Sequence, residues 1–264
     1  MYAPEYDRFL AAWRACQGAT YPLGGGGPCY FYARLVDGSS TWSSNNITIT
    51  ANTGYQVEPA IAYVPSRDEF WVAWIERLAI MAQRVSTTGL LVGEPFTIVQ
   101  GIAGMSDPSI SSISTQAEFL VVWSDTRGGQ YHASAPVGGV YNSIYAQRVL
   151  SNGIRVGNAF RVSNSTSDLQ PKVAYLSEID QYVVAWSRFE NDYNIYAHWV
   201  SQSGQSLGGD FAVVIAPQDQ THSIVTGHNL AFVLWDDARG SPDIRGRFLQ
   251  MPSWIYLPLV VQGG

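Results

Sequence analysis

The chain has 264 residues, a net charge of −6 and a charged fraction of only 14%. Lys172 is the only lysine and no basic face is visible, which argues against a nucleic-acid partner. No apolar run is long enough to span a bilayer, so membrane insertion is not expected. A chain of this length has ample material for a buried core.

A repeat organises the sequence, and its most regular part is a short apolar stretch that ends in tryptophan. The stretches end at Trp13, Trp74, Trp123, Trp186 and Trp235. Their spacing of about 50 to 60 residues is typical of four-stranded propeller blades rather than of helical solenoids. Each stretch is apolar on both faces, as expected for a strand that is covered on both sides. We therefore expect the tryptophans to form the core between blades.

Each repeat contains the signals of four short strands. In three repeats the strand before the tryptophan stretch starts with a polar residue followed by proline, which suits a position where no backbone donor is required. The fifth repeat has a weaker version of this strand, and the first repeat has only its end. After it come a strand of the type IYAQRV and a hairpin whose glycines supply the positive φ of a tight turn. The hairpin residues recur as Gly89, Gly93 and Phe96, as Gly153, Gly157 and Phe160, and as Gly204, Gly208 and Phe211.

The repeat predicts an all-β fold, a five-bladed β-propeller of four-stranded antiparallel blades in one domain over residues 1–264. The blades are expected at approximately 1–54, 55–104, 105–166, 167–217 and 218–264. Residues 1–13 align with the end of a first strand and the strand after it, so we expect the ring to be closed by pairing of the N- and C-terminal strands. The apolar tail 253–262 supplies either the outer strand of blade five or the missing inner strand of blade one.

Cys16 and Cys29 are the only cysteines and bracket a glycine-rich loop. A disulfide between them would close that loop at its base and stabilise the fold. Paired cysteines favour an oxidising compartment, so we expect a secreted or cell-surface protein. No CxxC motif or histidine cluster accompanies them, which argues against zinc.

The connections between the second and third strands are long in blade one, over 16–29, and in blade three, over 128–142. With the first strand innermost, both would rise over the same face and wall a groove. Aromatic residues beside polar ones suit sugar rings there, although such residues also pack locally in glycine-rich loops. The candidate ligand-binding residues are Tyr21, Tyr30, Tyr131, His132, Tyr141 and Tyr193.

Polar residues at the starts of the inner strands should ring the channel mouth on that same face. They are Glu58, Asp107, Gln170 and Thr221, with Asp168 and Asp219 two residues before the last two. Three interpretations stay open for the carboxylates. They cap turns and face water, they hold calcium through Glu58, Asp107 and Asp219, or they are paired acids of a glycosidase. No other cofactor is suggested.

The segments WSDTRGG from Trp123 and WDDARGS from Trp235 share the pattern W-x-D-x-R-G, and IYAQRV follows the first of them. This pattern resembles the repeats of secreted bacterial β-propellers of the Tol-associated type. The five blades are similar to the architecture of five-bladed lectins and of family 43 glycoside hydrolases. The hydrolase resemblance implies Glu58, Asp107 and Asp168 as catalytic carboxylates, although the motifs around those acids differ from that family's.

Two other features have structural interpretations. In the W-x-D-x-R-G segments, Asp125 and Asp237 are expected to accept backbone N–H groups while Arg127 and Arg239 brace the neighbouring strand. His198, inside a third strand, is expected to be a packed residue.

These features together favour a secreted, non-catalytic, lectin-like propeller that binds a glycan or protein ligand on the face bearing 16–29 and 128–142. One alternative is a glycoside hydrolase that uses the channel-mouth carboxylates. Another is a protein-binding or structural module of a cell-surface assembly. No GxSxG element, phosphate loop or zincin motif is present, so the balance is toward a protein that is not an enzyme. No recognisable motif identifies the ligand or the oligomeric state.

Overall fold

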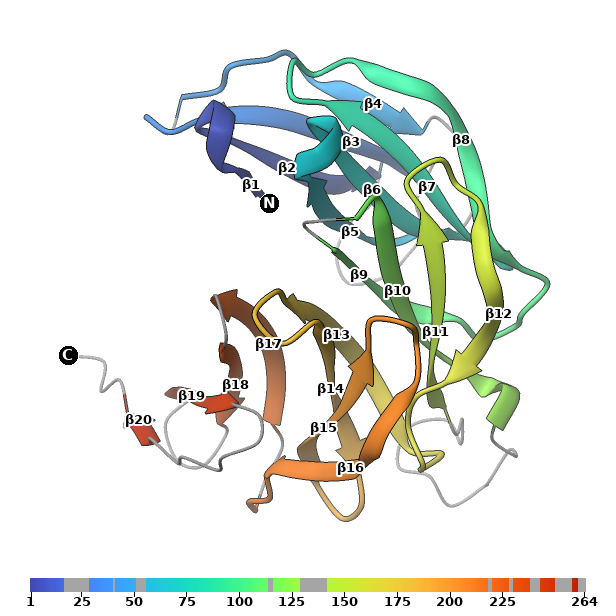
Figure 1. Cartoon of the computed structure of the whole chain (residues 1–264), viewed down its shortest axis with the longest axis vertical. Coiled ribbons are helices and arrows are strands. Elements are labelled where there is room, and N and C mark those ends of the chain that lie inside the picture. The colour runs from blue at the N-terminus through green and yellow to red at the C-terminus, as the bar shows by residue number, and fades with distance from the viewer. Residues whose placement is uncertain are drawn as a thin grey trace. The chain divides into compact units, whose positions relative to one another are not determined.

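The computed structural model describes residues 1–16, 29–39, 41–50, 56–113, 116–128, 142–217, 220–227, 230–237, 243–249 and 258–260 (Figure 1). Over these ranges the chain forms five four-stranded sheets and, apart from three single 3-10 turns, no helix. In each sheet the strands are hydrogen-bonded in chain order. The predicted all-β propeller fold of four-stranded blades is confirmed. Within these ranges no helix is long and apolar enough to cross a membrane.

The contacts divide the chain into two compact units. One unit comprises Met1–Phe119 and Val149–Val156, and the other comprises Leu120–Arg148 and Gly157–Gly264. The first unit contains the first two sheets, the second contains the last two, and strands of the third sheet belong to both. A single domain and closure of the ring through the terminal strands stay predictions.

The first two sheets consist of antiparallel strands. The first strand of each sheet leads to the second through a single 3-10 turn, η1 (Pro4–Tyr6) or η2 (Pro65–Arg67). The strands of the first sheet are β1 (Tyr2–Ala3), β2 (Arg8–Cys16), β3 (Cys29–Asp37) and β4 (Ile47–Thr50). Those of the second are β5 (Gln56–Val64), β6 (Glu69–Glu76), β7 (Ala79–Ser86) and β8 (Leu91–Gln100).

The other three sheets repeat this order. The strands of the third sheet are β9 (Ser106–Ser112), β10 (Glu118–Asp125), β11 (Ser143–Leu150) and β12 (Arg155–Arg161), with the turn η3 (Thr126–Gly128) after β10. Those of the fourth are β13 (Asp168–Leu176), β14 (Gln181–Phe189), β15 (Tyr193–Ser201) and β16 (Ser206–Val214). Those of the fifth are β17 (Gln220–Gly227), β18 (Leu230–Asp237), β19 (Asp243–Leu249) and β20 (Pro258–Val260).

The apolar tail contributes the outer strand of the fifth sheet, because β20 pairs with β19 in antiparallel register. This selects one of the two roles that the sequence left open. The short strand β1 pairs with β2, as expected for the end of a first strand.

The second-strand tryptophans form the core that was predicted for them. Trp74, Trp123 and Trp186 are at most 1% exposed and Trp235 is 8% exposed, whereas Trp13 is half-buried. In the first unit, Trp74 packs in a cluster that draws on the first and second sheets, with its ring 6.2 Å from that of Phe31. In the second unit, a similar cluster draws on the fourth and fifth sheets. Burial of these large rings supplies much of the apolar area removed from water.

The hairpin glycines have two reasons to be glycine. Gly89, Gly153 and Gly204 have φ of +86°, +89° and +84°, as predicted for the turn. A Cβ on Gly153 would also lie 3.0 Å from Cδ2 of Phe96, in the outer strand of the preceding sheet. A Cβ on Gly204 would lie 3.2 Å from Cε1 of Phe160, again in the preceding sheet. Each of these two turns therefore rests on the phenylalanine of the sheet before it, which explains why glycine and phenylalanine recur together.

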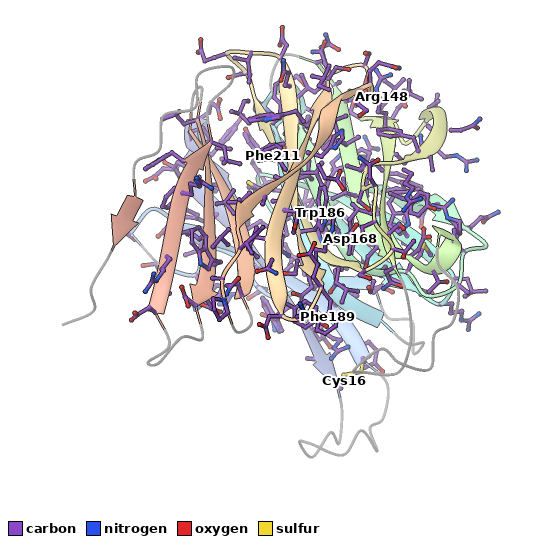
Figure 2. All side chains as sticks on the ribbon, turned by 90° about the horizontal axis from the view of Figure 1, so that it is seen from below. Cys16, Arg148, Asp168, Trp186, Phe189 and Phe211 are labelled. Carbon is purple, nitrogen blue, oxygen red and sulfur yellow. A yellow bond between two sulfur atoms is a disulfide. The ribbon has the colours of Figure 1, made fainter. Side chains whose placement is uncertain are left out.

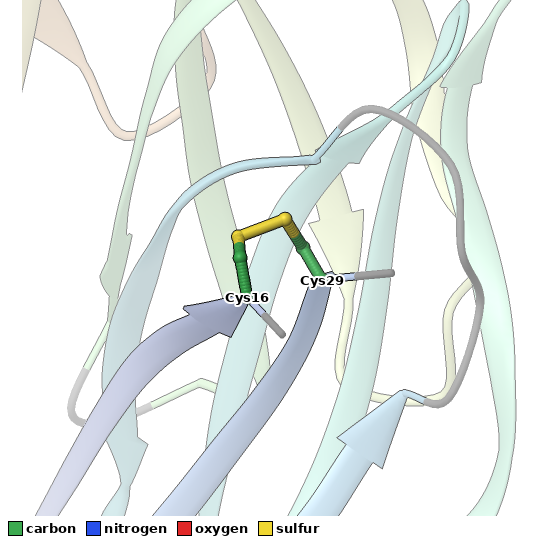
Figure 3. The surroundings of a disulfide bond; sticks show 2 residues. All are labelled: Cys16 and Cys29. Carbon is green, nitrogen blue, oxygen red and sulfur yellow. A yellow bond between two sulfur atoms is a disulfide. The ribbon is translucent and has the colours of Figure 1, made fainter. Parts of the chain in front are cut away.

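The predicted disulfide is present and joins Cys16, the last residue of β2, to Cys29, the first residue of β3 (Figure 3). The two residues are direct partners in the antiparallel pairing. The bond therefore closes the connection at its base, where the two strands already meet. A disulfide also indicates an oxidising compartment.

We expect Gly153→Ala to destabilise the chain more than Gly157→Ala. Both residues have positive φ, at +89° and +68°, but a Cβ on Gly157 would meet nothing within 4 Å. The left-handed backbone alone should lower the free energy of unfolding by about 1–2 kcal/mol in Gly157→Ala. Overlap with Phe96 should add about 1–3 kcal/mol in Gly153→Ala. Urea denaturation of both variants measures the difference, and equal losses would contradict the contact with Phe96.

Reduction of the disulfide should lower the free energy of unfolding by about 3 kcal/mol, because a closed loop of this size restricts the unfolded chain. The loop joins residues 13 apart in sequence. Denaturation with and without a reducing agent measures the loss. A Cys16→Ser/Cys29→Ser variant serves as the control, since its stability should match that of the reduced protein and should not respond to the reductant. A reductant effect on this variant would show that the loss has another source.

Candidate functional site

The structure describes only part of the predicted site. Tyr21, Tyr131, His132, Tyr141 and Asp219 lie outside the described residues, and only the backbone of Glu58 and Thr221 is described. Two of the aromatic candidates belong to strands rather than to loops, because Tyr30 is the second residue of β3 and Tyr193 is the first residue of β15. The described candidates are therefore Tyr30, Asp107, Asp168 and Tyr193.

Tyr30 lies on one face of the first sheet beside other aromatic residues. Its ring is 6.2 Å from that of Tyr32, and Tyr32 lies 6.2 Å from Trp13 in the neighbouring strand β2. The predicted role of Tyr30 in ligand binding stays a prediction.

The first strands of the third and fourth sheets have an irregular backbone at two of the positions that were predicted to ring the channel mouth. Asp107 and Gln170 have left-handed φ of 53° and 55°, and each directly precedes a proline. The register of β13 against β14 shifts between Leu169 and Lys172 at this point. A bulge re-aims a side chain, and a left-handed non-glycine residue costs energy that functional sites often tolerate. Gln170 is exposed and Asp107 is half-buried.

An aromatic pair marks the same end of the fourth sheet. Phe189 ends β14 and pairs with Tyr193 at the start of β15, and their rings are 5.2 Å apart in an edge-on arrangement (Figure 2). Both side chains are half-buried. Three residues after Tyr193, the hydroxyl of Tyr196 donates to Glu190 at 2.8 Å. This end of the sheet thus combines aromatic faces with the exposed polar side chains of Gln170 and Glu190.

Asp168 is held in a buried ion pair. Its side chain, labelled in Figure 2, is 0% exposed. Arg188 of β14 donates to Oδ1 through Nε at 2.7 Å and to Oδ2 through Nη2 at 3.2 Å. Burial raises the pKa of Asp168 above its ordinary value, although the hydrogen bonds and the charge of Arg188 act in the opposite direction. Because both carboxylate oxygens face Arg188, this acid links β13 to β14 and does not face an open pocket.

Arg188 also binds a second acid, Asp210 of β16, which it meets through Nη2 at 2.5 Å. Asp210 further accepts the backbone N–H of Asn164 at 2.9 Å and lies 3.0 Å from Nδ1 of His198. Burial alone would raise the pKa of Asp210, but the hydrogen bonds from His198 and Arg188 outweigh it, so the pKa lies below its ordinary value. His198 is 1% exposed, which confirms the predicted packed strand residue and adds polar partners to it.

The second and third sheets have glutamine where the fourth sheet has His198, and their hydrogen bonds differ. At the position of His198, the second sheet has Gln83, in the segment IMAQRV, and the third sheet has Gln147, in the segment IYAQRV. The amide of Gln83 donates to the carbonyl oxygen of Gly93 at 3.1 Å, and that of Gln147 donates to the carbonyl oxygen of Gly157 at 3.3 Å. Arg188, Asp210 and Ser206 were not predicted as site residues. The change from glutamine to histidine in an otherwise regular strand was the available signal.

The W-x-D-x-R-G segment has the predicted structural role at Asp125. Asp125 is buried, accepts the backbone N–H of Arg127 at 2.9 Å and accepts Nε1 of Trp123 at 2.7 Å. The guanidinium of Arg127 lies 4.0 Å from the ring centre of Tyr145 in the neighbouring strand β11. Asp237 is also buried and lies 3.0 Å from Arg245, while Arg239 is outside the described residues.

No group of three or more histidine, cysteine, aspartate or glutamate side chains in the described ranges could hold a metal ion. Of the three predicted calcium ligands, only Asp107 has a described side chain. Calcium binding stays a prediction.

Replacement of Arg188 by methionine should lower the free energy of unfolding by about 3–5 kcal/mol at pH 7, because Asp168 is left buried without its partner. Loss of the guanidinium raises the pKa of Asp168 further, so the carboxyl takes up a proton more readily as the pH falls. The deficit relative to wild type should therefore shrink as the pH is lowered toward about 4. Urea denaturation across this pH range measures both effects.

Arg84→Met is the matched control, since Arg84 pairs with Glu69 at 3.5 Å and its side chain is 22% exposed. Its loss should stay below about 1 kcal/mol. Equal deficits in the two variants, or a deficit in Arg188→Met that grows on acidification, would contradict the buried ion pair.

No protein-family model matches the sequence, and no curated protein matches it. Solved structures are similar in fold. An ulvan lyase of polysaccharide lyase family 25 has a TM-score of 0.62 and 9% identity, over 96% of this chain and 67% of that chain. An α-L-arabinofuranosidase from Clostridium thermocellum has a TM-score of 0.56 and 13% identity, over 97% and 91%. TolB from Acinetobacter baumannii has a TM-score of 0.51 and 13% identity, over 87% of this chain and 49% of that chain.

The chain therefore spans about half the length of TolB. At these identities the similarity concerns the fold alone. It confirms, at the level of fold, the resemblance to Tol-associated propellers and to family 43 hydrolases.

Proposed function

We propose that this protein is a secreted, lectin-like propeller that binds a glycan without cleaving it, on the face bearing residues 16–29 and 128–142. The observation that carries the proposal is the end of the fourth sheet. There the half-buried rings of Phe189 and Tyr193 lie 5.2 Å apart, and the neighbouring strand β13 carries the exposed residue Gln170 at a bulge near its start. The disulfide supports an oxidising compartment and hence secretion.

The chemistry of this surface matches a sugar ring. The apolar C–H face of a sugar packs against aromatic rings such as those of Phe189 and Tyr193. Sugar hydroxyls both donate and accept hydrogen bonds, and the amide of Gln170 can meet them in either role. Glu190 adds an exposed carboxylate that accepts only. A small number of polar groups that converge beside an aromatic surface is typical of small-ligand sites.

The repeat supports the same face. The connection between β14 and β15 is equivalent in the repeat to the connections that contain Tyr21, Tyr131, His132 and Tyr141. We propose that these residues and Tyr30 add further contacts to the ligand. The ulvan lyase, whose solved complex contains a glucuronate–rhamnose sulfate chain, and the α-L-arabinofuranosidase act on carbohydrates with a similar fold.

We do not propose the glycoside hydrolase alternative. A glycosidase needs two carboxyl groups about 5–9.5 Å apart in an open site. Asp168, one of the three candidates, is fully buried and bound by Arg188 through both oxygens. A protein ligand in place of a glycan is an outcome of the experiment below.

A glycan array tests the proposal with wild type, Tyr193→Ala, Tyr131→Ala and a control, Tyr6→Ala. Tyr6 is exposed and lies in η1, which joins the first strand of its sheet to the second rather than the second to the third. Loss of a stacked ring should weaken binding by about 1–3 kcal/mol, or roughly ten- to a hundredfold, in Tyr193→Ala. Tyr131→Ala is expected to weaken binding as well, and Tyr6→Ala should bind as wild type does.

Analysis of the bound sugar, with a Glu58→Gln variant beside wild type, separates binding from cleavage. Recovery of the intact sugar from both proteins supports a lectin. Cleavage that is lost in Glu58→Gln would establish the hydrolase. If wild type binds no sugar on the array, a protein ligand or a structural module is favoured.

A further inference from the structure

Three side chains of the fourth sheet form a chain of short hydrogen bonds. The Oγ atom of Ser206 lies 2.7 Å from Nε2 of His198, and Nδ1 of the same ring lies 3.0 Å from Oδ1 of Asp210. His198 belongs to β15, and the other two residues belong to β16. A hydroxyl, an imidazole and a carboxylate in this order and at these distances form the constellation that activates a serine nucleophile.

The partners fix the roles of the ring nitrogens. An ionised carboxylate can only accept hydrogen bonds, so in the neutral imidazole Nδ1 carries the proton toward Asp210. Nε2 is then left with a lone pair directed at the hydroxyl of Ser206. Asp210 is kept ionised by Arg188 and by the backbone N–H of Asn164, both of which donate to its other oxygen. In its neutral form the histidine therefore has the tautomer that a general base requires.

The fold does not require a histidine at this place. In the second and third sheets the equivalent residues Gln83 and Gln147 fill the same position and bind carbonyl oxygens of the outer strand. The register of β15 against β16 shifts between Ala197 and Trp199, and that of β7 against β8 shifts at the equivalent place, between Ala82 and Arg84. The irregular pairing therefore belongs to the repeat, and only the side chain at its centre differs. The histidine with its two side-chain partners is a departure from the repeat and not a consequence of it.

The serine residue is exposed while the groups behind it are buried. Ser206 is an exposed residue, whereas the side chains of His198 and Asp210 are 1% and 6% exposed. Beyond Ser206 the chain continues through Gly208 and Gly209, and a Cβ on either glycine would meet nothing within 4 Å. An acyl group can therefore approach Oγ from the outside. The carbonyl oxygen of Gly208, at 3.3 Å, is a weaker second partner for the hydroxyl.

We propose that Ser206 is the nucleophile of an acyl-transfer site that hydrolyses carboxylic esters exposed to it, with His198 as general base and Asp210 as the residue that orients the ring. Oγ of Ser206 bonds to the carbonyl carbon of the ester as its proton passes to Nε2 of His198. The bond from that carbon to the leaving alcohol breaks, and the alkoxide takes the proton from Nε2. Water then repeats the sequence on the acyl-serine, which releases the carboxylic acid and restores the hydroxyl.

This activity is additional to glycan binding and does not depend on it. The serine lies at the hairpin between β15 and β16, whereas the surface of Phe189 and Tyr193 lies at the hairpin between β14 and β15. Failure of either proposal would leave the other standing.

A fluorophosphonate probe tests the nucleophile, because an activated serine displaces fluoride from phosphorus and keeps the phosphonyl group. Peptide mass spectrometry of the labelled full chain should place the group on Ser206. Hydrolysis of 4-nitrophenyl acetate should exceed the buffer rate and should fall at least about a hundredfold in Ser206→Ala and in His198→Gln. His198→Gln installs the residue of the second and third sheets and should therefore fold. Ser203→Ala, in the same hairpin, is the matched control and should behave as wild type.

Asp210→Asn tests the orienting role through the ring itself. In wild type, at a pH where the ring of His198 is neutral, its ¹⁵N chemical shifts should show a protonated Nδ1 and an unprotonated Nε2. In Asp210→Asn this preference should be lost together with probe labelling. Absence of label on Ser206 in wild type, or labelling and ester hydrolysis that persist unchanged in His198→Gln, would overturn the proposal.

Discussion

The packing of each hairpin on the sheet before it is the constraint on which the described architecture depends. At Gly153 and Gly204 the turn needs a left-handed backbone and leaves little room for a Cβ, because Phe96, or Phe160 together with Arg148, of the preceding sheet lies close by. Buried tryptophans of the second strands complete the contact between sheets. One interaction, used repeatedly, accounts for the spacing of glycine, phenylalanine and tryptophan along the sequence, and it leaves the strand ends and hairpins free to vary.

The fourth sheet is where the chain uses that freedom most. Glutamines 83 and 147 bind the backbone of the outer strand in the second and third sheets, so the same position can be purely structural. In the fourth sheet His198 instead joins Ser206 to Asp210, and Arg188 connects Asp210 to the buried Asp168. A buried polar network of this kind stabilises the fold only if each member has a partner. Because the repeat already stabilises the fold, a residue that departs from it, such as His198, is free to serve a function.

Local and repeated features could be predicted from the sequence, and contacts between distant residues could not. The strands, the turn glycines, the disulfide and the role of Asp125 follow from short patterns whose partners lie close in the chain. Asp168 was expected at an open channel mouth but is buried against Arg188. This partner is 20 residues away in the sequence, and no local pattern predicts the pairing. Tyr193 was expected in a loop and begins a strand, because single aromatic residues at a strand end carry no signal of the boundary.

The central claim is that the repeat supplies stability and that departures in the fourth sheet supply function. A double variant, Tyr193→Asn with His198→Gln, tests it most directly, because it restores the residues found at these places in the third sheet, Asn142 and Gln147. Its free energy of unfolding should lie within about 1 kcal/mol of wild type, while glycan binding and labelling of Ser206 should both be lost. A variant that unfolds, or one that keeps both activities, would contradict the account.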